Sequence, residues 1–218
     1  MTQTMERAAM ALIALTLIAT VWVYVRDKVY FYEVFAAEDG LVEYGTALFL
    51  LVASVILAVH AWGMRGRART IAIGLTLLYS LIFFMAAGEE ISWGQRIFGW
   101  ASGEFFMENN KQYETNFHNL VVGDLHLAKT LFGSVLTVVI LLYLVVLPLL
   151  YPRGGWVMRW ADRLAVPVPW LKHGVIALLA SIVIALIDVH RKWEVYELIF
   201  SLLVVSIFLI PQNREKVS

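Results

Sequence analysis

Residues 70–87 read TIAIGLTLLYSLIFFMAA, and residues 88–100 continue as GEEISWGQRIFGW. The first stretch contains no charged side chain. Because an α-helix rises 1.5 Å per residue, about 18 to 20 apolar residues are enough to cross the hydrocarbon core of a membrane. Two adjacent glutamates and, a few residues later, an arginine follow this apolar run. The stretch therefore predicts a membrane-spanning helix that ends in a group of polar side chains.

The composition of the whole chain is that of an integral membrane protein. Of its 218 residues 61% are hydrophobic and only 16% are charged, and the mean hydropathy is +0.75. An ordinary soluble domain is less apolar and carries about 25% charged residues. Basic and acidic residues balance at 17 each, which argues against nucleic acid as a partner. The absence of cysteine excludes disulfides and thiolate metal sites.

The apolar runs predict an all-α fold, a polytopic transmembrane helix bundle with about six spans in a single domain, residues 1–218. No run alternates with the period of two that barrel strands require. Between the third and fourth spans we expect an interfacial or re-entrant segment. The predicted spans are residues 8–25, 41–62, 70–88, 127–151, 173–188 and 195–211.

The distribution of charge predicts how the chain is oriented. Arg65, Arg67 and Arg69 lie in one short loop, and four more basic residues lie between residues 151 and 172. Short loops rich in Lys and Arg face the cytoplasm, so both termini should be cytoplasmic, in the inner membrane of a bacterium. The segments on the other side hold 14 of the 17 acidic residues. Within the second basic loop, VMRWADRLA at 157–165 suits an anchor in the headgroup region.

The polar stretch after the third span contains Glu89, Glu90, Trp93, Gln95 and Arg96. If the helix continued, Glu89, Trp93 and Arg96 would share one face, and Arg96 would pair with Glu89 or with an acid from elsewhere. Ionisable groups at the edge of a membrane span are often functional. The alternative is that the two glutamates simply end the span where charges meet water.

The next polar stretch, ENNKQYETNFHNLVVGDLH at 108–126, supplies Glu114, Asn116 and His118. If it is helical, Glu114 and His118 lie one turn apart, a spacing that suits metal binding or acid-base catalysis. We predict Glu89, Glu90, Glu114 and His118 as catalytic residues, with a divalent metal ion at Glu89, Glu90 and His118. A polar, Asn-rich surface loop is the alternative.

Two further glutamates lie just inside apolar runs. Glu43 begins the second span and Glu197 enters the sixth. Together with Arg96, Gln95, Trp93 and Asn116, they are candidate substrate-binding residues around one polar pocket that opens outward between spans two, three, four and six. Alternatively, each glutamate extends to the interface or pairs with a nearby Arg or Lys.

Three segments, EDGLVEYGTALFLL, GEEISWGQRIFGW and NNKQYETNFHNL, occur in this order. In this respect the chain resembles a family of bacterial polytopic membrane proteins without an assigned activity, over residues 36–126. The resemblance implies a polytopic membrane fold, and it implies that seven residues belong to the family pattern. These are Glu89, Glu90, Trp93, Gln95, Arg96, Asn116 and His118.

Three functions fit these patterns. The first is an enzyme, a hydrolase or transferase that acts at the outer leaflet on a lipid headgroup or a lipid-linked substrate, with Arg96 binding an anionic group. The second is a transporter, channel or ion-binding component. The third is a non-catalytic subunit or sensor that docks a membrane partner protein or a second copy. A serine mechanism is disfavoured, because Ser92, Ser102 and Ser134 have no evident partner in the sequence.

Overall fold

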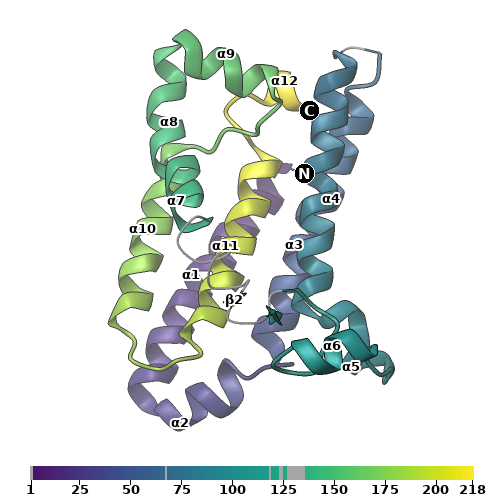
Figure 1. Ribbon diagram of the computed structural model, residues 1–218. Coiled ribbons are helices and arrows are strands. Elements are labelled where there is room, and N and C mark those ends of the chain that lie inside the picture. The colour runs from purple at the N-terminus through teal and green to yellow at the C-terminus, as the bar shows by residue number, and fades with distance from the viewer. Residues whose placement is uncertain (1, 67, 118, 123–124, 127–135) are drawn as a thin grey trace.

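The computed structural model describes residues 1–218 except 1, 67, 118, 123–124 and 127–135. The fold is an all-α bundle, as predicted, and its long helices run roughly along one axis (Figure 1). Each long helix matches one of the apolar runs of the sequence. They are α1 (Thr2–Arg26), α3 (Leu41–Gly63), α4 (Thr70–Glu90), α10 (Leu171–Leu186) and α11 (Lys192–Leu209).

Helix α11 is the centre of the bundle and packs against α1, α3 and α10. Every residue from Ser201 to Leu209 is buried. The two buried serines of this stretch are satisfied, because the Ser201 hydroxyl donates to Leu198 O at 2.8 Å and the Ser206 hydroxyl lies 3.1 Å from His173 Nε2. Unpaired polar groups would be costly here. The half of α11 from Ser201 to Leu209 is therefore enclosed by other parts of the protein.

Helices α3 and α4 form the tightest pair, and small side chains line their contact. Ser54 and Ser80 meet near the middle of the pair. The Ser54 hydroxyl donates to Ser80 O at 2.7 Å, and the Ser80 hydroxyl donates to Ser54 O at 2.8 Å. Small residues let helix backbones approach closely in membranes, and hydroxyls then bond across the contact.

The prediction of about six spans is not confirmed. Within the described residues, α1, α3 and α4 are long and apolar enough to cross a membrane, and a bent pair of helices raises the number to four at most. Helix α10 has 16 residues, about 24 Å of helix, which is shorter than the hydrocarbon core. Of the predicted fourth span, 127–151, the structure describes the part from residue 136 onward.

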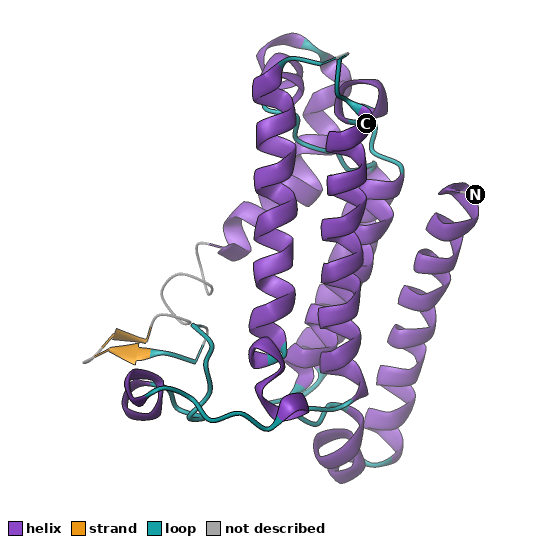
Figure 2. Ribbon diagram, turned by 90° about the vertical axis from the view of Figure 1, so that its right-hand side faces the viewer, coloured by secondary structure: helices purple, strands orange, loops and turns teal. Residues whose placement is uncertain are grey.

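That bent pair turns by 114° between Val138–Arg153 and Gly155–Arg163. Gly154 and Gly155 form the turn with φ of 73° and 76°, a backbone region that glycine adopts without strain. The second helix of the pair lies across the end of the bundle (Figure 2). The elements of the pair are α7 (Leu136–Leu141), η4 (Leu142–Val146), α8 (Leu147–Leu150), η5 (Tyr151–Arg153) and α9 (Gly155–Arg163).

The segment predicted to be interfacial or re-entrant lies at the opposite end of the bundle from α9 (Figure 1). Its short helices lie near the end of the α3–α4 pair, and its two-residue strands stand to one side of the bundle (Figure 2). In the strands, Val121 pairs with His126 and Val122 with Leu125. The remaining elements are α2 (Lys28–Tyr30), η1 (Phe31–Phe35), η2 (Ser92–Gly94), α5 (Gln95–Phe98), α6 (Glu104–Asn109), β1 (Val121–Val122), β2 (Leu125–His126) and α12 (Arg214–Val217).

Candidate functional site

The chain leaves α4 through a sharp turn, so the helix does not continue through Trp93 and Arg96. Helix α4 ends at Glu90, and Ser92 and Trp93 have positive φ values of 46° and 55°. The turn folds the Trp93 ring back over Gly88, where an added Cβ would lie 2.8 Å from the ring. The Trp93 indole N–H donates to Glu89 Oε1 at 3.0 Å. Glu89 and Trp93 are thus brought together by a kink and not by a shared helix face.

The turn places Ser92 beside Glu114 and Asn116, and all three side chains are buried. The Ser92 hydroxyl donates to Glu114 Oε2 at 2.5 Å, and Asn116 Nδ2 donates to Ser92 Oγ at 2.8 Å and to Glu114 Oε2 at 3.0 Å. Asn110 Nδ2 donates to Asn116 Oδ1 at 2.8 Å. We call these residues, with Arg96, the Ser92–Glu114 network.

Arg96 connects this network to the loop before α3. Its guanidinium pairs with Glu114, and Nη1 lies 2.7 Å from Asp39 Oδ2. Partial burial acts to lower the pKa of Arg96, but the hydrogen bond and charge of Glu114 and the charge of Asp39 raise it overall. Burial raises the pKa of Asp39, against the attraction of Arg96. Of the two partners predicted for Arg96, an acid from elsewhere is the correct one.

Gln95 holds the same segment by its side-chain oxygen. Oε1 accepts hydrogen bonds from the Thr115 amide at 2.9 Å and from the Ser102 hydroxyl at 3.0 Å. Asn110 Oδ1 accepts from the Gln112 amide at 2.9 Å. These bonds fix loop backbone that has no helix or sheet of its own, which is the usual work of buried amide side chains. The side chains of Gln95, Asn110 and Asn116 thus make hydrogen bonds within the segment.

A second group of acids faces the bundle itself. Glu43, Glu90, Glu194 and Glu197, which we call the acidic cluster, come from the ends of α3, α4 and α11 and interact electrostatically with one another. Glu43 also accepts a hydrogen bond from the Asp39 amide at the start of α3. Within the described residues, none of the four forms a salt bridge. By its residue surface Glu197 is exposed, and the other three are partly exposed.

The predicted catalytic residues therefore divide between two groups. Glu114 belongs to the Ser92–Glu114 network, and Glu90 belongs to the acidic cluster. Glu89 accepts the Phe117 amide at 2.5 Å as well as the Trp93 indole. The expectation of one shared pocket is not met by the residues described. The cavity between η4, α10 and α11 is apolar and has about 10 Å³, room for one water at most.

The predicted metal site depends on His118, which lies outside the described residues. Among the residues that the structure describes, no group of three or more His, Asp or Glu side chains is arranged to hold a metal ion. Glu89 and Glu90 supply two carboxylates at most, and their contacts differ. A divalent metal at Glu89, Glu90 and His118 therefore stays a prediction.

Sequence reasoning missed Ser92, Asp39 and Asn110. Ser92 was expected to lack a partner, whereas it donates a short hydrogen bond to a buried carboxylate. Ser102 also has partners, Gln95 and Thr115, and Ser134 lies outside the described residues. The one available signal was the density of Asn, Gln and Glu between residues 108 and 119, because so many amides in a short loop indicate side chains that bond the backbone.

Comparisons with known proteins add no assignment. No family model matches the chain, and neither the curated proteins nor the solved structures give a match. The resemblance in residues 36–126 therefore remains a resemblance. Any statement of function depends on the two groups of polar residues described above.

Proposed function

We propose that this membrane protein is an enzyme that acts on a lipid headgroup or lipid-linked substrate, with Glu90 as the acid-base residue. The observation that supports this most is the electrostatic interaction of Glu90 with Glu43, Glu194 and Glu197, which lie towards the ends of three helices. Neighbouring carboxyl groups in different protonation states are a common basis for proton transfer. Glu90 would accept a proton from an attacking water or hydroxyl, and a protonated neighbour would return one to the leaving oxygen.

The site would lie where a bilayer has its headgroups. Glu43 lies in the first turn of α3 and Glu90 is the last residue of α4, so both mark the edge of a span rather than its middle. Arg96 would bind an anionic group only by exchanging Asp39 for it, because both its acidic partners already neutralise it. In our proposal this end faces the periplasm of a bacterial inner membrane and both termini face the cytoplasm.

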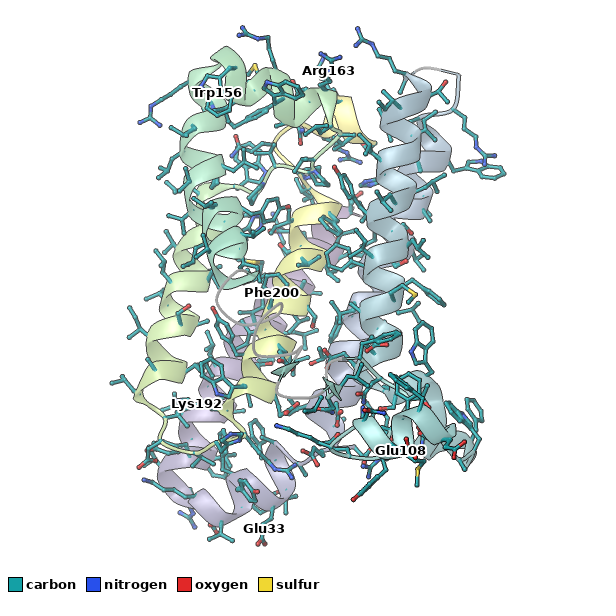
Figure 3. All side chains as sticks on the ribbon, viewed as in Figure 1. Glu33, Glu108, Trp156, Arg163, Lys192 and Phe200 are labelled. Atoms are coloured by element: carbon teal, nitrogen blue, oxygen red, sulfur yellow. The ribbon has the colours of Figure 1, made fainter. Side chains whose placement is uncertain are left out.

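A comparison of Glu90→Gln with Glu33→Gln tests the enzyme. The purified chain is placed in nanodiscs made from a bacterial lipid extract, and headgroup changes are followed by mass spectrometry. Wild type should convert a lipid. Glu33→Gln is the matched control and should convert it equally, because Glu33 is an exposed acid at the same end of the bundle and lies outside the acidic cluster (Figure 3). Glu90→Gln should lose at least 100-fold of the rate, the usual contribution of a positioned acid or base, about 10² to 10⁴. Equal rates in Glu90→Gln and wild type would contradict the assignment.

The acidic cluster also favours a second candidate, a cation-binding component or transporter. Among the described residues, the four carboxylates of this cluster form no salt bridge. When ionised they attract cations, and salt weakens this attraction. In proteoliposomes that contain a pH-sensitive dye, a cation gradient would then drive proton movement through wild type and not through Glu90→Gln. Proton movement without any lipid conversion would favour this candidate over the enzyme.

The closed Ser92–Glu114 network favours a third candidate, a non-catalytic subunit or sensor. A fully bonded polar segment at the end of a bundle suits docking to a second copy or a membrane partner protein. Absence of both lipid conversion and ion movement, together with a defined oligomer by native mass spectrometry, would select it. Metal analysis of wild type, Glu89→Gln, Glu90→Gln and His118→Ala tests the metal version in the same preparations.

A further inference from the structure

Helix α9, at the far end of the bundle from the acidic cluster, exposes two tryptophans and two arginines on one face. Trp156, Arg159, Trp160 and Arg163 are three or four residues apart, so they share that face, and all four are exposed. Trp156 is 67% exposed and Trp160 is 51% exposed. The Arg163 guanidinium lies over the Trp160 ring at 5.5 Å. We call these four residues the α9 face.

The opposite side of α9 is already occupied by the protein. Ala161 is buried, and Asp162 accepts hydrogen bonds from the Tyr151 hydroxyl at 2.9 Å and from Asn213 Nδ2 at 3.2 Å. Asn213 also donates to Val166 O at 2.9 Å. The segment between α11 and α12 thus holds α9 in place. The only acid of α9 is turned inward and bonded, so the α9 face carries positive charge alone.

The direction of α9 suits contact with a membrane surface. The 114° bend turns α9 across the end of the long apolar helices, and Figure 3 shows Trp156 and Arg163 at the end opposite Glu108 and Lys192. Tryptophan is favoured at the level of the lipid headgroups, and arginine there reaches phosphate with its guanidinium. Arg65, stacked at 3.6 Å over Trp62, adds a second such pair.

We propose that the α9 face binds the headgroups of anionic phospholipids in the leaflet at this end of the bundle. Charge complementarity selects the occupant, since two arginines face outward and the only acid is withdrawn. The tryptophans select a bilayer over soluble polyanions, because their apolar rings need the acyl boundary beneath the phosphates. The inference is independent of the proposed function, which concerns the other end.

The test uses the full-length protein in detergent, titrated with dioleoyl-phosphatidylglycerol or dioleoyl-phosphatidylcholine, with bound lipid counted by native mass spectrometry. Phosphatidylglycerol should bind more tightly, and Arg159→Gln with Arg163→Gln should weaken it about fivefold for each arginine removed. Arg159→Lys with Arg163→Lys should retain the binding, because the charge remains. The matched control removes two exposed basic residues at the other end, Arg26→Gln with Lys111→Gln, and should bind as wild type does.

Four results would overturn the proposal. They are equal binding of the two lipids, wild-type binding by the double Gln variant, an equal loss in the control variant, and full competition by inorganic phosphate, which would indicate a soluble anion instead. Binding should also weaken as sodium chloride is raised, because salt screens exposed charges. If the double Gln variant does not fold, the salt titration of wild type and the lysine variant decides the question, and salt-independent binding contradicts the proposal.

Discussion

The Ser92 hydroxyl donates a hydrogen bond of 2.5 Å to the carboxylate of Glu114. The backbone of Ser92 has a φ of 46°, which is unusual for any residue except glycine. Glu114 also pairs with Arg96, and its side chain is 9% exposed. One buried carboxylate therefore holds the turn after α4, helix α5 and the loop at residues 110–117 together. The stability of this end of the protein should depend on it.

The first prediction concerns that carboxylate. Glu114→Gln removes the charge that faces Arg96, and it should lower the free energy of unfolding by about 2 kcal/mol, since a buried carboxylate that accepts charged and neutral hydrogen bonds is lost while Arg96 keeps Asp39. Unfolding in detergent, followed by circular dichroism, measures the change. Glu108→Gln is the control, because Glu108 is exposed (Figure 3). An equal effect of the two substitutions would contradict the central place of Glu114.

The second prediction concerns the contact of Gly88 with Trp93. An added Cβ at Gly88 would lie 2.8 Å from the ring, so Gly88→Ala should displace Trp93 and cost about 1 to 3 kcal/mol. Gly74→Ala in the same helix meets nothing within 4 Å and should be neutral or stabilising, because alanine favours a helix over glycine. Near-ultraviolet circular dichroism should change for the first variant and not for the second. Identical behaviour of the two would show that the ring does not lie on Gly88.

The third prediction concerns the ion pair that closes the turn before α11. Lys28 Nζ lies 2.9 Å from Asp188 Oδ1, and the Tyr24 hydroxyl donates to the same oxygen at 2.6 Å. The hydrogen bond from Tyr24, followed by that from Lys28, lowers the pKa of Asp188, and the hydrogen bond to Asp188 raises the pKa of Lys28. Both shifts favour the charged forms in the folded state.

The resulting pH dependence follows from the two signs. The contribution of Asp188 is present above its unfolded pKa of about 3.9 and is lost as pH falls through its lower folded value. The contribution of Lys28 is present below about 10.4 and is lost as pH rises through its higher folded value. Unfolding midpoints of wild type and Asp188→Asn should differ by a constant amount between these limits and converge at acid pH. A difference that persists unchanged at acid pH would contradict the ion pair as its cause.

The fourth prediction concerns the paired serines of α3 and α4. Replacing Ser54 and Ser80 together by alanine should cost about 0.6 to 1.7 kcal/mol, the range for hydrogen bonds between membrane helices. The two single substitutions complete a double-mutant cycle, whose coupling energy isolates the 3.1 Å contact between the two hydroxyls, because the backbone acceptors remain in every variant. Reversible unfolding in mixed micelles provides the measurement. Strict additivity of the two single effects would mean that the hydroxyls do not depend on each other.

Much of the fold could be predicted from the sequence, because apolar length dictates a membrane helix. The expected second and third spans, 41–62 and 70–88, differ from α3 and α4 by two residues at most. The number of spans could not be predicted, since hydropathy does not distinguish a helix enclosed by protein, such as α11, from one that faces lipid. The enclosed half of α11, Ser201 to Leu209, holds no charged residue, as in a membrane span.

The candidate site was predicted in its residues more than in its contacts. Glu90, Glu43 and Glu197 lie towards the helix ends on one side of the bundle and interact electrostatically, whereas their sharing of one pocket stays a prediction. The turn at Ser92 and Trp93 was missed, since positive φ at a serine and a tryptophan has no local sequence signal. The partnership of Arg96 with Asp39 was missed as well, because it joins segments that only the packing of α3 on α4 brings together.

The paired serines, Ser54 and Ser80, set the axial positions of Glu43 and Glu90 relative to each other. The helices α3 and α4 are antiparallel. The distance along α3 from Ser54 to Glu43 is about 16 Å, and the distance along α4 from Ser80 to Glu90 is about 15 Å. The two carboxylates are therefore carried to nearly the same level. Sliding α3 along α4 would break both hydroxyl hydrogen bonds in an interior without water. The relative position of the two glutamates is therefore fixed by the register of the two helices at the serines, near the middle of the pair.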